Sequence, residues 1–489
     1  MTRGLLSYLR RNTHVGFERW TWIKMEDTYK NFIHRYPEYE TTSRIDELRA
    51  TDYSRIDRTR QVYLDYTGGG LYADSQVIKH QALLLGGVFG NPHSSNPTSL
   101  AATELIESAR AYVLKFFNAD PDEYDVIFTS NASGALKLVG ESYPFSPRGH
   151  YLLTFDNHNS VNGIREFAHA RGAPVTYLPV ALPDLRVMEG QLDSALDRAG
   201  VDGDNLFAYP AQSNFSSVQH PLDWVERAHA KGWDVLLDAA AFAPTSQLDL
   251  SHYKPDFVPL SFYKMFGYPT GLGALIARRD RLHKLQRPWF AGGTITVASV
   301  QGGKYYLADG HTAFEDGTVD YLDIPAVEIG LRHLESIGMD LIKRRVLSLT
   351  GWLLENLVAM VHSTGVKLVN IYGPTDTRAR GGAVTVNFYD KHGNSIDHRS
   401  IEELANQHHI SLRTGCFCNP GAGEVALGIS RLELDVCFTS PEHADRLTLD
   451  DFRLCIDGKS TGAVRISVGM VTNYTDVQAF LGFCEGLLD

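Results

Sequence analysis

Cysteine is scarce in this sequence, and its scarcity excludes one class of protein. The chain has 489 residues and five cysteines: Cys416, Cys418, Cys437, Cys455 and Cys484. Small secreted domains carry dense cysteine frameworks of even number that form disulfides. A sparse, odd set in a long chain is typical of reduced thiols, so we expect a cytoplasmic protein.

Long apolar runs and an excess of positive charge are also lacking. The N-terminal stretch MTRGLLSYLRRNTHVGFERW has no sustained apolar segment, so it predicts neither a signal peptide nor a spanning helix. The 46 lysine and arginine residues are outnumbered by 58 aspartate and glutamate residues, which gives a net charge of -12. This balance argues against nucleic acid or an anionic membrane as the main partner.

The chain is instead rich in alternating apolar strands and helices. From about residue 126 to 280, runs such as DVIFTS, YLLTFDNH and DVLLDAAAF are separated by helical stretches. Near-continuous apolar strands are typical of a mostly parallel sheet covered on both faces. The later strands VKLVNIYG, AVTVNFYD and GAVRISVGM predict a smaller α+β unit. The predicted fold is therefore α/β.

The length of the chain predicts more than one domain, because a single core usually splits beyond roughly 250–300 residues. We expect an N-terminal extension over residues 1–60 and a large domain over residues 61–340. A smaller C-terminal domain over residues 341–489 would carry the loop with Cys418.

The stretch SFYKMFGYPTGLGAL, residues 261–275, places one lysine among aromatic and apolar neighbours. Lys264 precedes a glycine-rich turn and an apolar strand. Apolar surroundings disfavour the ammonium form and lower the pKa of a lysine, which suits Schiff-base chemistry. An arbitrary lysine at a strand end is more often a surface residue, so the stretch needs a partner to be informative.

That partner is the carboxylate in DVLLDAAAF. Asp238 ends an apolar strand 26 residues before Lys264, and α/β proteins bind their ligands at the carboxyl ends of such strands. Pyridoxal phosphate needs a lysine for its aldehyde and an acid beside its ring nitrogen. Alone, Asp238 fits a helix cap or a turn; with Lys264 it predicts a pyridoxal phosphate site.

Two further segments fit the same cofactor. In FTSNASGALKLVG, residues 128–140, a strand ends and a helix begins, and free amides at a helix N-terminus bind a phosphate. Ser130 and Asn131 fit an ordinary helix cap as well. In TFDNHNSVNGIRE, His158 follows a strand, where it either stacks on the pyridine ring or is an ordinary loop histidine.

Two cysteines lie one residue apart in LRTGCFCNPGAGE, residues 412–424. From the residues alone, a metal clip, a disulfide relic and a reactive thiol compete to explain the pair. A metal clip needs two more ligands, and Cys437 and Cys455 follow without a paired spacing. We therefore expect no metal site.

These segments, in this order, resemble fold-type I pyridoxal phosphate enzymes of the class V aminotransferase group, over nearly all of the chain from about residue 60. Five stretches closely resemble the cysteine desulfurase domain of molybdenum cofactor sulfurases: GNPHSSNPTS, FTSNASGALKLVGE, SFYKMFGYPTGLGAL, FEDGTVDYLDIPA and LRTGCFCNPGAGE. The resemblance implies a large domain with a mostly parallel sheet, a smaller α+β domain, pyridoxal 5'-phosphate as cofactor and L-cysteine as substrate.

The resemblance also implies roles for the matching residues. Lys264 matches the Schiff-base lysine, Asp238 the partner of the ring nitrogen, and His158 the histidine that stacks on the ring. Asn214 matches the contact to the ring hydroxyl, whereas Ala241 stands where many desulfurases carry a glutamine. The remaining matches to cofactor-binding positions are Ala132, Ser133, Ser261 and Tyr263.

Substrate and subunit contacts are implied in the same way. Arg465 matches the arginine that binds the substrate carboxylate through its two-pronged guanidinium group, and Arg413 is expected to assist it. From the residue alone, Arg465 also fits a surface arginine on an edge strand. Thr318 matches a residue that reaches the phosphate of the neighbouring subunit, which implies a homodimer.

For the cysteine pair, the resemblance favours the reactive thiol. In desulfurases with an Arg-Thr-Gly-x-x-Cys loop, the cysteine three residues after the glycine accepts the sulfur, and here this residue is Cys418. The implied reaction converts L-cysteine to L-alanine: Lys264 or His158 removes the α-proton, and the Cys418 thiolate takes the sulfur as a persulfide. Cys416 either supports this thiol or fills space.

Two departures leave the sulfur acceptor open. Molybdenum cofactor sulfurases usually carry a second, C-terminal domain for the cofactor that they sulfurate, whereas this sequence ends at Asp489. The family loop often continues Gly-Ala-Cys, whereas here it reads Gly421-Ala422-Gly423. We therefore expect the acceptor to be a separate protein or another small molecule. A C–S lyase, another biosynthetic enzyme acting on a modified amino acid, and a non-catalytic binding protein are the alternatives.

Overall fold

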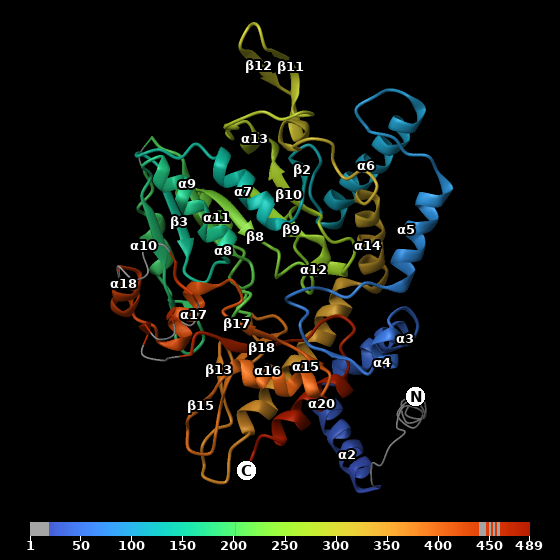
Figure 1. Cartoon of the computed structure of the whole chain (residues 1–489), viewed down its shortest axis with the longest axis vertical. Helices are drawn as coiled ribbons and strands as arrows, with labels where there is room; N and C mark the ends of the chain where they lie inside the picture. The colour runs from blue at the N-terminus through green and yellow to red at the C-terminus, as the bar shows by residue number, and fades with distance from the viewer. Residues whose placement is uncertain (1–18, 201, 440–445, 449–450, 453–454, 457–459) are drawn as a thin grey trace.

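Seven strands form the larger sheet, in the order β2-β10-β9-β8-β7-β3-β4 (Figure 1). The computed structural model describes residues 19–489 except 201, 440–445, 449–450, 453–454 and 457–459. Strand β10 is antiparallel to β2 and β9, and the other neighbouring pairs are parallel. The strands are β2 (Tyr124–Thr129), β3 (His150–Thr154), β4 (Val175–Leu178), β7 (Asn205–Pro210), β8 (Asp234–Asp238), β9 (Phe257–Ser261) and β10 (Gly273–Arg278).

Burial explains why these short runs become strands. Every residue of β3, β7, β8 and β9 is buried, as expected where helices cover both faces of a sheet. This confirms the mostly parallel α/β sheet. The sequence pattern does not predict β9, in which Pro259 lies at the centre. Proline is tolerated there because β9 pairs with β8 through Leu236 and Phe257 alone.

Helices flank this sheet on two sides (Figure 1). The long helices α5, α6 and α14 lie together, and α7 to α11 lie around β3 and β8. The helices of this half are α5 (Asp74–Gly86), α6 (Pro97–Phe116), α7 (Ala132–Ser142), α8 (Asn159–Asn162), α9 (Ile164–Ala170), α10 (Gln191–Leu196), α11 (Trp224–His229), α12 (Phe262–Phe266), α13 (Arg279–Leu282), η2 (Gly310–Phe314) and α14 (Ile324–Ile337).

A smaller, antiparallel sheet lies below the larger one in Figure 1. It consists of β13 (Val369–Tyr372), β14 (Ala383–Tyr389), β15 (Ser395–Ile396), β17 (Arg413–Gly415) and β18 (Ala463–Ser467). The helices of this half are α15 (Met339–Ala359), α16 (His398–Gln407), α17 (Pro420–Leu427), α18 (Arg431–Thr439) and α20 (Tyr474–Glu485). The long apolar stretch after residue 323 forms two helices, because Gly338 has a φ of 96° between α14 and α15.

The N-terminal segment packs on α15 and α20, away from the strand ends of the larger sheet (Figure 1). The Phe32 and Trp352 rings lie 5.6 Å apart, and Arg345 of α15 forms a buried ion pair with Asp46. Residues 1–18 of the expected extension lie outside the described residues. The elements are α2 (Arg19–Arg35), η1 (Pro37–Thr42), α3 (Ser43–Asp52) and α4 (Arg55–Arg58).

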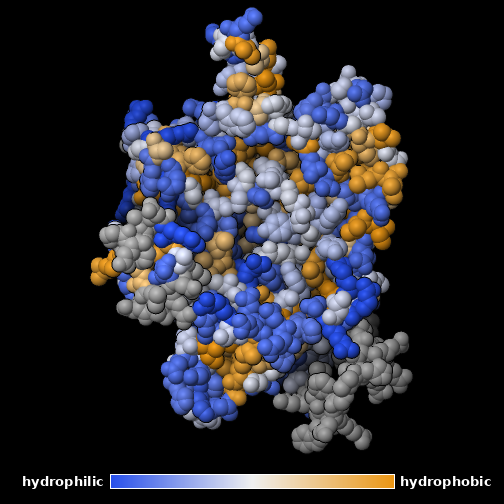
Figure 2. Space-filling view, viewed as in Figure 1, coloured by the Kyte–Doolittle hydropathy of each residue, from blue (hydrophilic) through white to orange (hydrophobic). Residues whose placement is uncertain are grey.

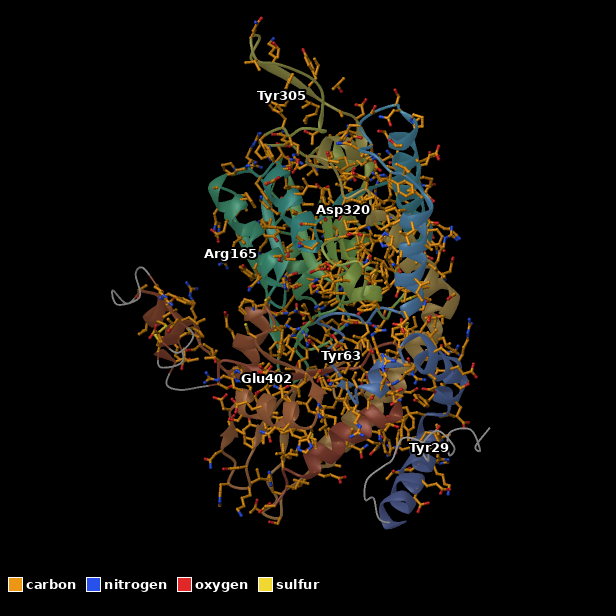
Figure 3. The ribbon with its side chains drawn as sticks, turned by 45° about the vertical axis from the view of Figure 1, so that its right-hand side comes forward. Tyr29, Tyr63, Arg165, Tyr305, Asp320 and Glu402 are labelled. Carbon is orange, nitrogen blue, oxygen red and sulfur yellow. A yellow bond between two sulfur atoms is a disulfide. The ribbon has the colours of Figure 1, made fainter. Side chains whose placement is uncertain are left out.

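The chain then joins the two halves of the molecule. Strand β1 (Val62–Tyr63) pairs in parallel with β16 (Ile410–Ser411), and Asp65 forms a bridge with Ser467. Figure 3 shows Tyr63 at this junction. Two hairpins complete the described elements: β5 (Val180–Ala181) with β6 (Arg186–Val187), and β11 (Ile295–Ser299) with β12 (Lys304–Leu307), which projects from the top of Figure 1.

The structure corrects one expectation about the cysteines. Cys437 of α18 and Cys455 are joined in a disulfide, whereas Cys416, Cys418 and Cys484 are free. Sparse cysteines predict reduced thiols, but the fold brings these two together across 18 residues of sequence, with their Cα atoms 5.5 Å apart. Within the described residues, no helix has the length and apolar character needed to cross a membrane.

Candidate active site

A cavity of about 190 Å³ opens at the carboxyl ends of the parallel strands. Its walls come from β8, β9, the start of α7 and the loop after β3. The structure therefore brings together every residue predicted to bind the cofactor of this chain, whereas Thr318 was predicted to serve the neighbouring subunit. These lining residues are Ala132, Ser133, His158, Asn214, Asp238, Ser261, Tyr263 and Lys264.

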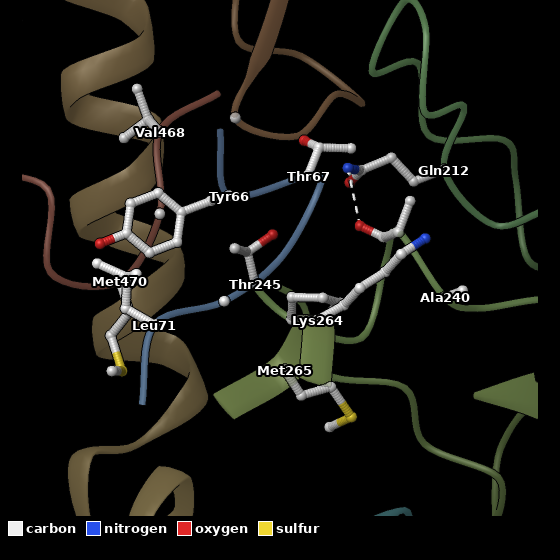
Figure 4. A pocket seen from close by; sticks show the side chains of 15 residues that line it. Tyr66, Thr67, Leu71, Gln212, Ala240, Thr245, Lys264, Met265, Val468 and Met470 are labelled. Atoms are coloured by element: carbon white, nitrogen blue, oxygen red, sulfur yellow. Dashed lines mark hydrogen bonds between the residues drawn. The ribbon is translucent and has the colours of Figure 1, made fainter. Parts of the chain in front are cut away.

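Lys264 lies on α12, a single helical turn directly after β9. The turn ends at Gly267, whose φ of 80° disfavours a side chain. Gly70 packs against it from the other side: a Cβ at residue 70 would lie 2.9 Å from the Lys264 carbonyl oxygen. Figure 4 shows the Lys264 side chain pointing toward Gln212 and Ala240. Both segments therefore fix the backbone that aims the amine into the site.

The burial of Lys264 disfavours its charged form. Burial lowers the pKa of Lys264, and the positive charge of Arg465 lowers it further, whereas Asp238 opposes the shift. A neutral amine is the form that reacts as a nucleophile. The local sequence and the tertiary structure agree on this point.

Asp238 and His158 face the same cavity. Asp238 ends β8, is 7% exposed, and its Oδ1 accepts a hydrogen bond of 3.0 Å from the Ala240 amide. Nδ1 of His158 accepts a hydrogen bond of 3.1 Å from the Ser160 amide, so the proton of the neutral ring lies on Nε2. Burial lowers the pKa of His158, which keeps the ring neutral at neutral pH.

The N-terminus of α7 forms another wall. Asn131 caps this helix, since its Oδ1 accepts a hydrogen bond of 3.0 Å from the Gly134 amide. The Ala132 amide donates to Ser261 Oγ at 3.0 Å, and the hydroxyls of Ser133 and Ser160 lie 2.7 Å apart. Asn131 is therefore a cap, and the same helix end also directs hydroxyl groups into the cavity.

The loop between β17 and α17 carries Cys418 to the edge of this site. Phe417 and Cys418 have φ angles of 56° and 54°, a backbone region that costs a residue with a side chain roughly 1–2 kcal/mol. Such a loop persists only where tertiary contacts hold it. The Phe417 ring is buried and lies 5.4 Å from the ring of Phe215.

Hydrogen bonds fix this loop to the larger sheet. The Phe417 carbonyl accepts from Asn214 Nδ2 at 2.7 Å, and the Cys418 carbonyl accepts from the Asn159 amide at 2.7 Å. Asn419 is fully buried, and its Nδ2 donates to the Asp156 carbonyl at 2.7 Å and to Asn214 Oδ1 at 2.8 Å. The Cys418 thiol itself is exposed and free.

The predicted substrate arginines are close together but differ in exposure. Arg465 of β18 is 2% exposed, and burial lowers its pKa to about 10. The side chain of Arg413 on β17 is 51% exposed. Both side chains bind the carboxylate of Asp65. Arg465 is therefore buried on a strand that lies between β14 and β17, and it is not a surface arginine on an edge strand.

Thr318, predicted to reach the phosphate of the neighbouring subunit, does not line this cavity, and neither do Cys418, Arg413 and Arg465. Thr318 is exposed, and its Oγ1 accepts a hydrogen bond of 3.2 Å from Asn91. Ala241 stands where many desulfurases carry a glutamine, and here its carbonyl accepts a hydrogen bond of 3.0 Å from Gln212 Nε2. Gln212, which follows β7 in the chain, thus reaches this part of the wall.

Three residues of the site were not predicted, because the sequence gives no signal strong enough to identify them. They are Asp65 and Asn419, which act across the junction of the two halves, and Gln212, which bonds to Ala241 within the larger half. An acid before the glycines of LDYTGGG and an asparagine after Cys418 are the weak signals that point to two of them. Among the described residues, no group of three or more metal-ligating side chains is arranged to hold an ion.

Comparisons with known proteins agree with this geometry. The family model described as aminotransferase class-V matches residues 62–480. The chain is 37% identical over 492 residues to a molybdenum cofactor sulfurase of Solanum lycopersicum, covering 94% of this chain and 59% of that protein. It is 39% identical to the Bos taurus protein of the same name, covering 89% of this chain and 51% of the relative. The chain thus spans between half and three-fifths of these relatives.

Solved structures share the fold. An apo cysteine desulfurase from Thermococcus onnurineus NA1 matches with a TM-score of 0.72 and 22% identity, over 91% of this chain and 98% of that one. The cysteine desulfurase CsdA from Escherichia coli matches with a TM-score of 0.70 and 19% identity, over 91% and 99%. The cystine C-S lyase C-DES matches with a TM-score of 0.65 and 17% identity, over 88% and 98%.

Proposed function

The chain belongs to the class V aminotransferase family, and on that basis we propose that it is a pyridoxal phosphate-dependent cysteine desulfurase. Its reaction would convert L-cysteine to L-alanine and leave the sulfur as a persulfide on Cys418. One observation carries this proposal. A free, exposed cysteine is held in a strained loop whose backbone is hydrogen-bonded to Asn159 and Asn214, and Asn214 lines the cavity.

The residues of the cavity fit pyridoxal phosphate. Lys264 would hold the aldehyde, the buried Asp238 the ring nitrogen, and the N-terminal turn of α7 the phosphate, with Ser133 and Ser261 nearby. When bound, this cofactor supplies an electron sink for the charge that develops at the α-carbon. His158, following β3, would cover the ring, and Asn214 would reach its hydroxyl.

Each side chain then has a separate task. Arg465 orients the substrate through its carboxylate. Either Lys264 or His158 removes the α-proton, since burial lowers the pKa of each and so favours the neutral form that acts as a base. The Cys418 thiolate forms a bond to the substrate sulfur while the bond between that sulfur and the β-carbon breaks. The electron pair of the broken bond remains with carbon, which is released in L-alanine after protonation.

We also propose that the protein is a cytoplasmic homodimer. Apolar side chains are exposed along and just after α5: Ile78 is 63%, Leu85 80% and Val88 76% exposed. Figure 2 shows an apolar patch over this helix, and such patches are typical of subunit contacts. In this arrangement, Thr318 would serve the cavity of the partner subunit. The sulfur acceptor would be a separate protein or a small molecule.

The decisive experiment measures L-alanine formed from L-cysteine under reducing conditions. The variants are Lys264→Ala, Cys418→Ala and, as the matched control, Cys416→Ala, which removes the other exposed thiol of the same loop. We expect alanine from the wild type and from Cys416→Ala, and none from the other two. If Cys418→Ala remains fully active while Lys264→Ala is inactive, the persulfide role is wrong and the protein is a lyase.

A further inference from the structure

One carboxylate lies between the two arginines of the substrate site. Oδ1 of Asp65 accepts a hydrogen bond of 3.1 Å from Arg465 Nη2. Oδ2 accepts from Arg413 twice, at 2.9 Å from Nε and 2.6 Å from Nη2. Asp65 is 6% and Arg465 2% exposed, so solvent screens the bond between these two residues weakly. The resemblance assigns Arg465 and Arg413 to the carboxylate of the substrate. In this protein, the carboxylate of Asp65 already binds both of these arginines.

The backbone fixes Asp65 there. Its bridge to Ser467 places it beside β18, two residues from Arg465. The glycine turn folds back on Asp65, because the amides of Gly68 and Gly69 donate to the backbone carbonyl of Asp65 at 3.0 and 3.2 Å. A Cβ on Gly68 would lie 2.5 Å from Asp65 Oδ2 and 2.7 Å from Arg413 Nη2. Because Gly68 has no side chain, the ion pair between Asp65 and Arg413 can occupy this space.

The two arginines are left in different states. Arg413 uses its Nε and Nη2 groups on Asp65, and this bonding raises its pKa. Arg465 donates from Nη1 to the Asn214 carbonyl at 2.9 Å, and the Phe417 ring lies 4.7 Å from its guanidinium carbon. Nε of Arg465 is buried without a hydrogen-bond partner in the part of the chain that the structure describes. Arg465 therefore retains a donor for an incoming oxygen.

The charges set how many anionic groups the site accepts. Two guanidinium groups and one carboxylate leave a single net positive charge, which one carboxylate neutralises. Arg465 has an Nε donor without a partner, so the remaining positive charge favours the binding of one carboxylate at Arg465. A second anionic group would have to displace Asp65 from Arg413 to bind that guanidinium group.

We propose that Asp65 determines substrate specificity: it occupies Arg413, leaves Arg465 to bind one carboxylate, and excludes amino acids whose side chain carries a second anionic group. This inference rests on the proposed function, because it takes Arg465 as the group that binds the substrate carboxylate. The chemical class selected is an amino acid with an uncharged or thiol side chain. Asp65 acts through the arginines, so it is a positioning residue.

The test compares two competitors that differ in the charge of their side chain. L-serine and L-aspartate compete with L-cysteine during alanine formation by the cofactor-loaded protein, and the ratio of their inhibition constants measures selectivity. Asp65→Asn frees Arg413 to bind the side chain of L-aspartate. The inhibition constant of L-aspartate should therefore fall about tenfold relative to that of L-serine, which is the usual scale of one charge-assisted contact. Asp65→Asn combined with Arg413→Gln should restore the wild-type ratio.

Two further variants control for charge and for folding. Glu402→Gln removes a negative charge beside Thr414, the residue after Arg413 in β17, where Glu402 Oε2 accepts a hydrogen bond of 2.7 Å from Thr414, and should leave the ratio unchanged. Arg413→Gln alone should also leave it unchanged, because Asp65 already occupies Arg413. This variant keeps the proposal testable if Asp65→Asn does not fold.

The outcomes separate the two proposals. The specificity proposal is wrong if Asp65→Asn leaves the ratio unchanged, if Glu402→Gln shifts it equally, or if Arg413→Gln alone weakens L-aspartate relative to L-serine. In these cases alanine formation persists, so the proposed function stands. Absence of alanine from the wild type would overturn the proposed function instead. Calorimetric binding of L-serine and L-aspartate to the same loaded variants would then still decide the charge selectivity.

Discussion

Asn419 Nδ2 donates a hydrogen bond of 2.8 Å to Asn214 Oδ1, and this bond ties the Cys418 loop to the end of β7. Asn419 also caps α17, since its Oδ1 accepts from the Ala422 amide at 3.2 Å. One buried side chain thus fixes a strained loop to the larger sheet and starts the helix that follows. The position of the thiol depends on this connection.

Replacing Asn419 by alanine should destabilise the protein and impair sulfur transfer. The change leaves Asn214 Oδ1 and the Asp156 carbonyl without their donor, at a cost of roughly 1–3 kcal/mol for a buried polar group. Chemical denaturation measures the loss, and alanine formation should fall even where the protein is folded. Asn406→Ala, on the exposed face of α16, is the matched control and should change stability by less than about 0.5 kcal/mol.

Two glycines of the same helix should respond in opposite ways. A Cβ on Gly421 would lie 2.0 Å from the Phe155 carbonyl oxygen, so Gly421→Ala should push α17 from the larger sheet and reduce both thermal stability and alanine formation. A Cβ on Gly423 would meet Cys416 at 3.7 Å, an ordinary contact. Gly423→Ala should therefore be tolerated, with a gain of roughly 0.5–1 kcal/mol from helix propensity. Equal losses in both variants would contradict this account of the close approach.

The activity should fall in acid as His158 becomes protonated. Burial lowers the pKa of His158 below the ordinary value of 6.5, so the neutral ring persists at neutral pH and is lost only as the pH falls below that value. The pH profile of alanine formation should show this acidic limb. His158→Gln should remove the limb and lower the rate about 100- to 10,000-fold if the ring transfers the proton. His169→Gln, on α9, should leave the profile as in the wild type.

Lys264 should cost the cofactor-free protein stability, and the cost should depend on pH. Because burial lowers the pKa of Lys264, the unfolded chain holds this proton more tightly than the folded one. The penalty is full below the folded pKa and disappears as the pH rises to the ordinary value of 10.5. Wild type should thus gain stability relative to Lys264→Met across this window. A difference in unfolding free energy that is flat with pH would show that the amine titrates normally.

The sequence determined the architecture and the chemical core of the site. Apolar runs of strand length, alternating with helices, are local features, and they predicted the mostly parallel sheet. Asp238 was recognised because it ends an apolar strand, and Lys264 because it lies among aromatic and apolar residues just before a glycine-rich turn. The domain bounds and the dimer stay predictions. The disulfide between Cys437 and Cys455 was missed, because spacing alone does not show which cysteines meet.

Only the tertiary structure decided how the site is controlled. Asp65 meets Arg413 and Arg465 across 348 and 400 residues of sequence, through a bridge that pairs the start of one half with a strand of the other. Asn419 meets Asn214 across 205 residues. Such bonds depend on how the two halves dock, and no local periodicity records that docking. The sequence thus specified which groups could carry out the chemistry, whereas the packing of the two halves set their charges, their orientation and the place of the thiol.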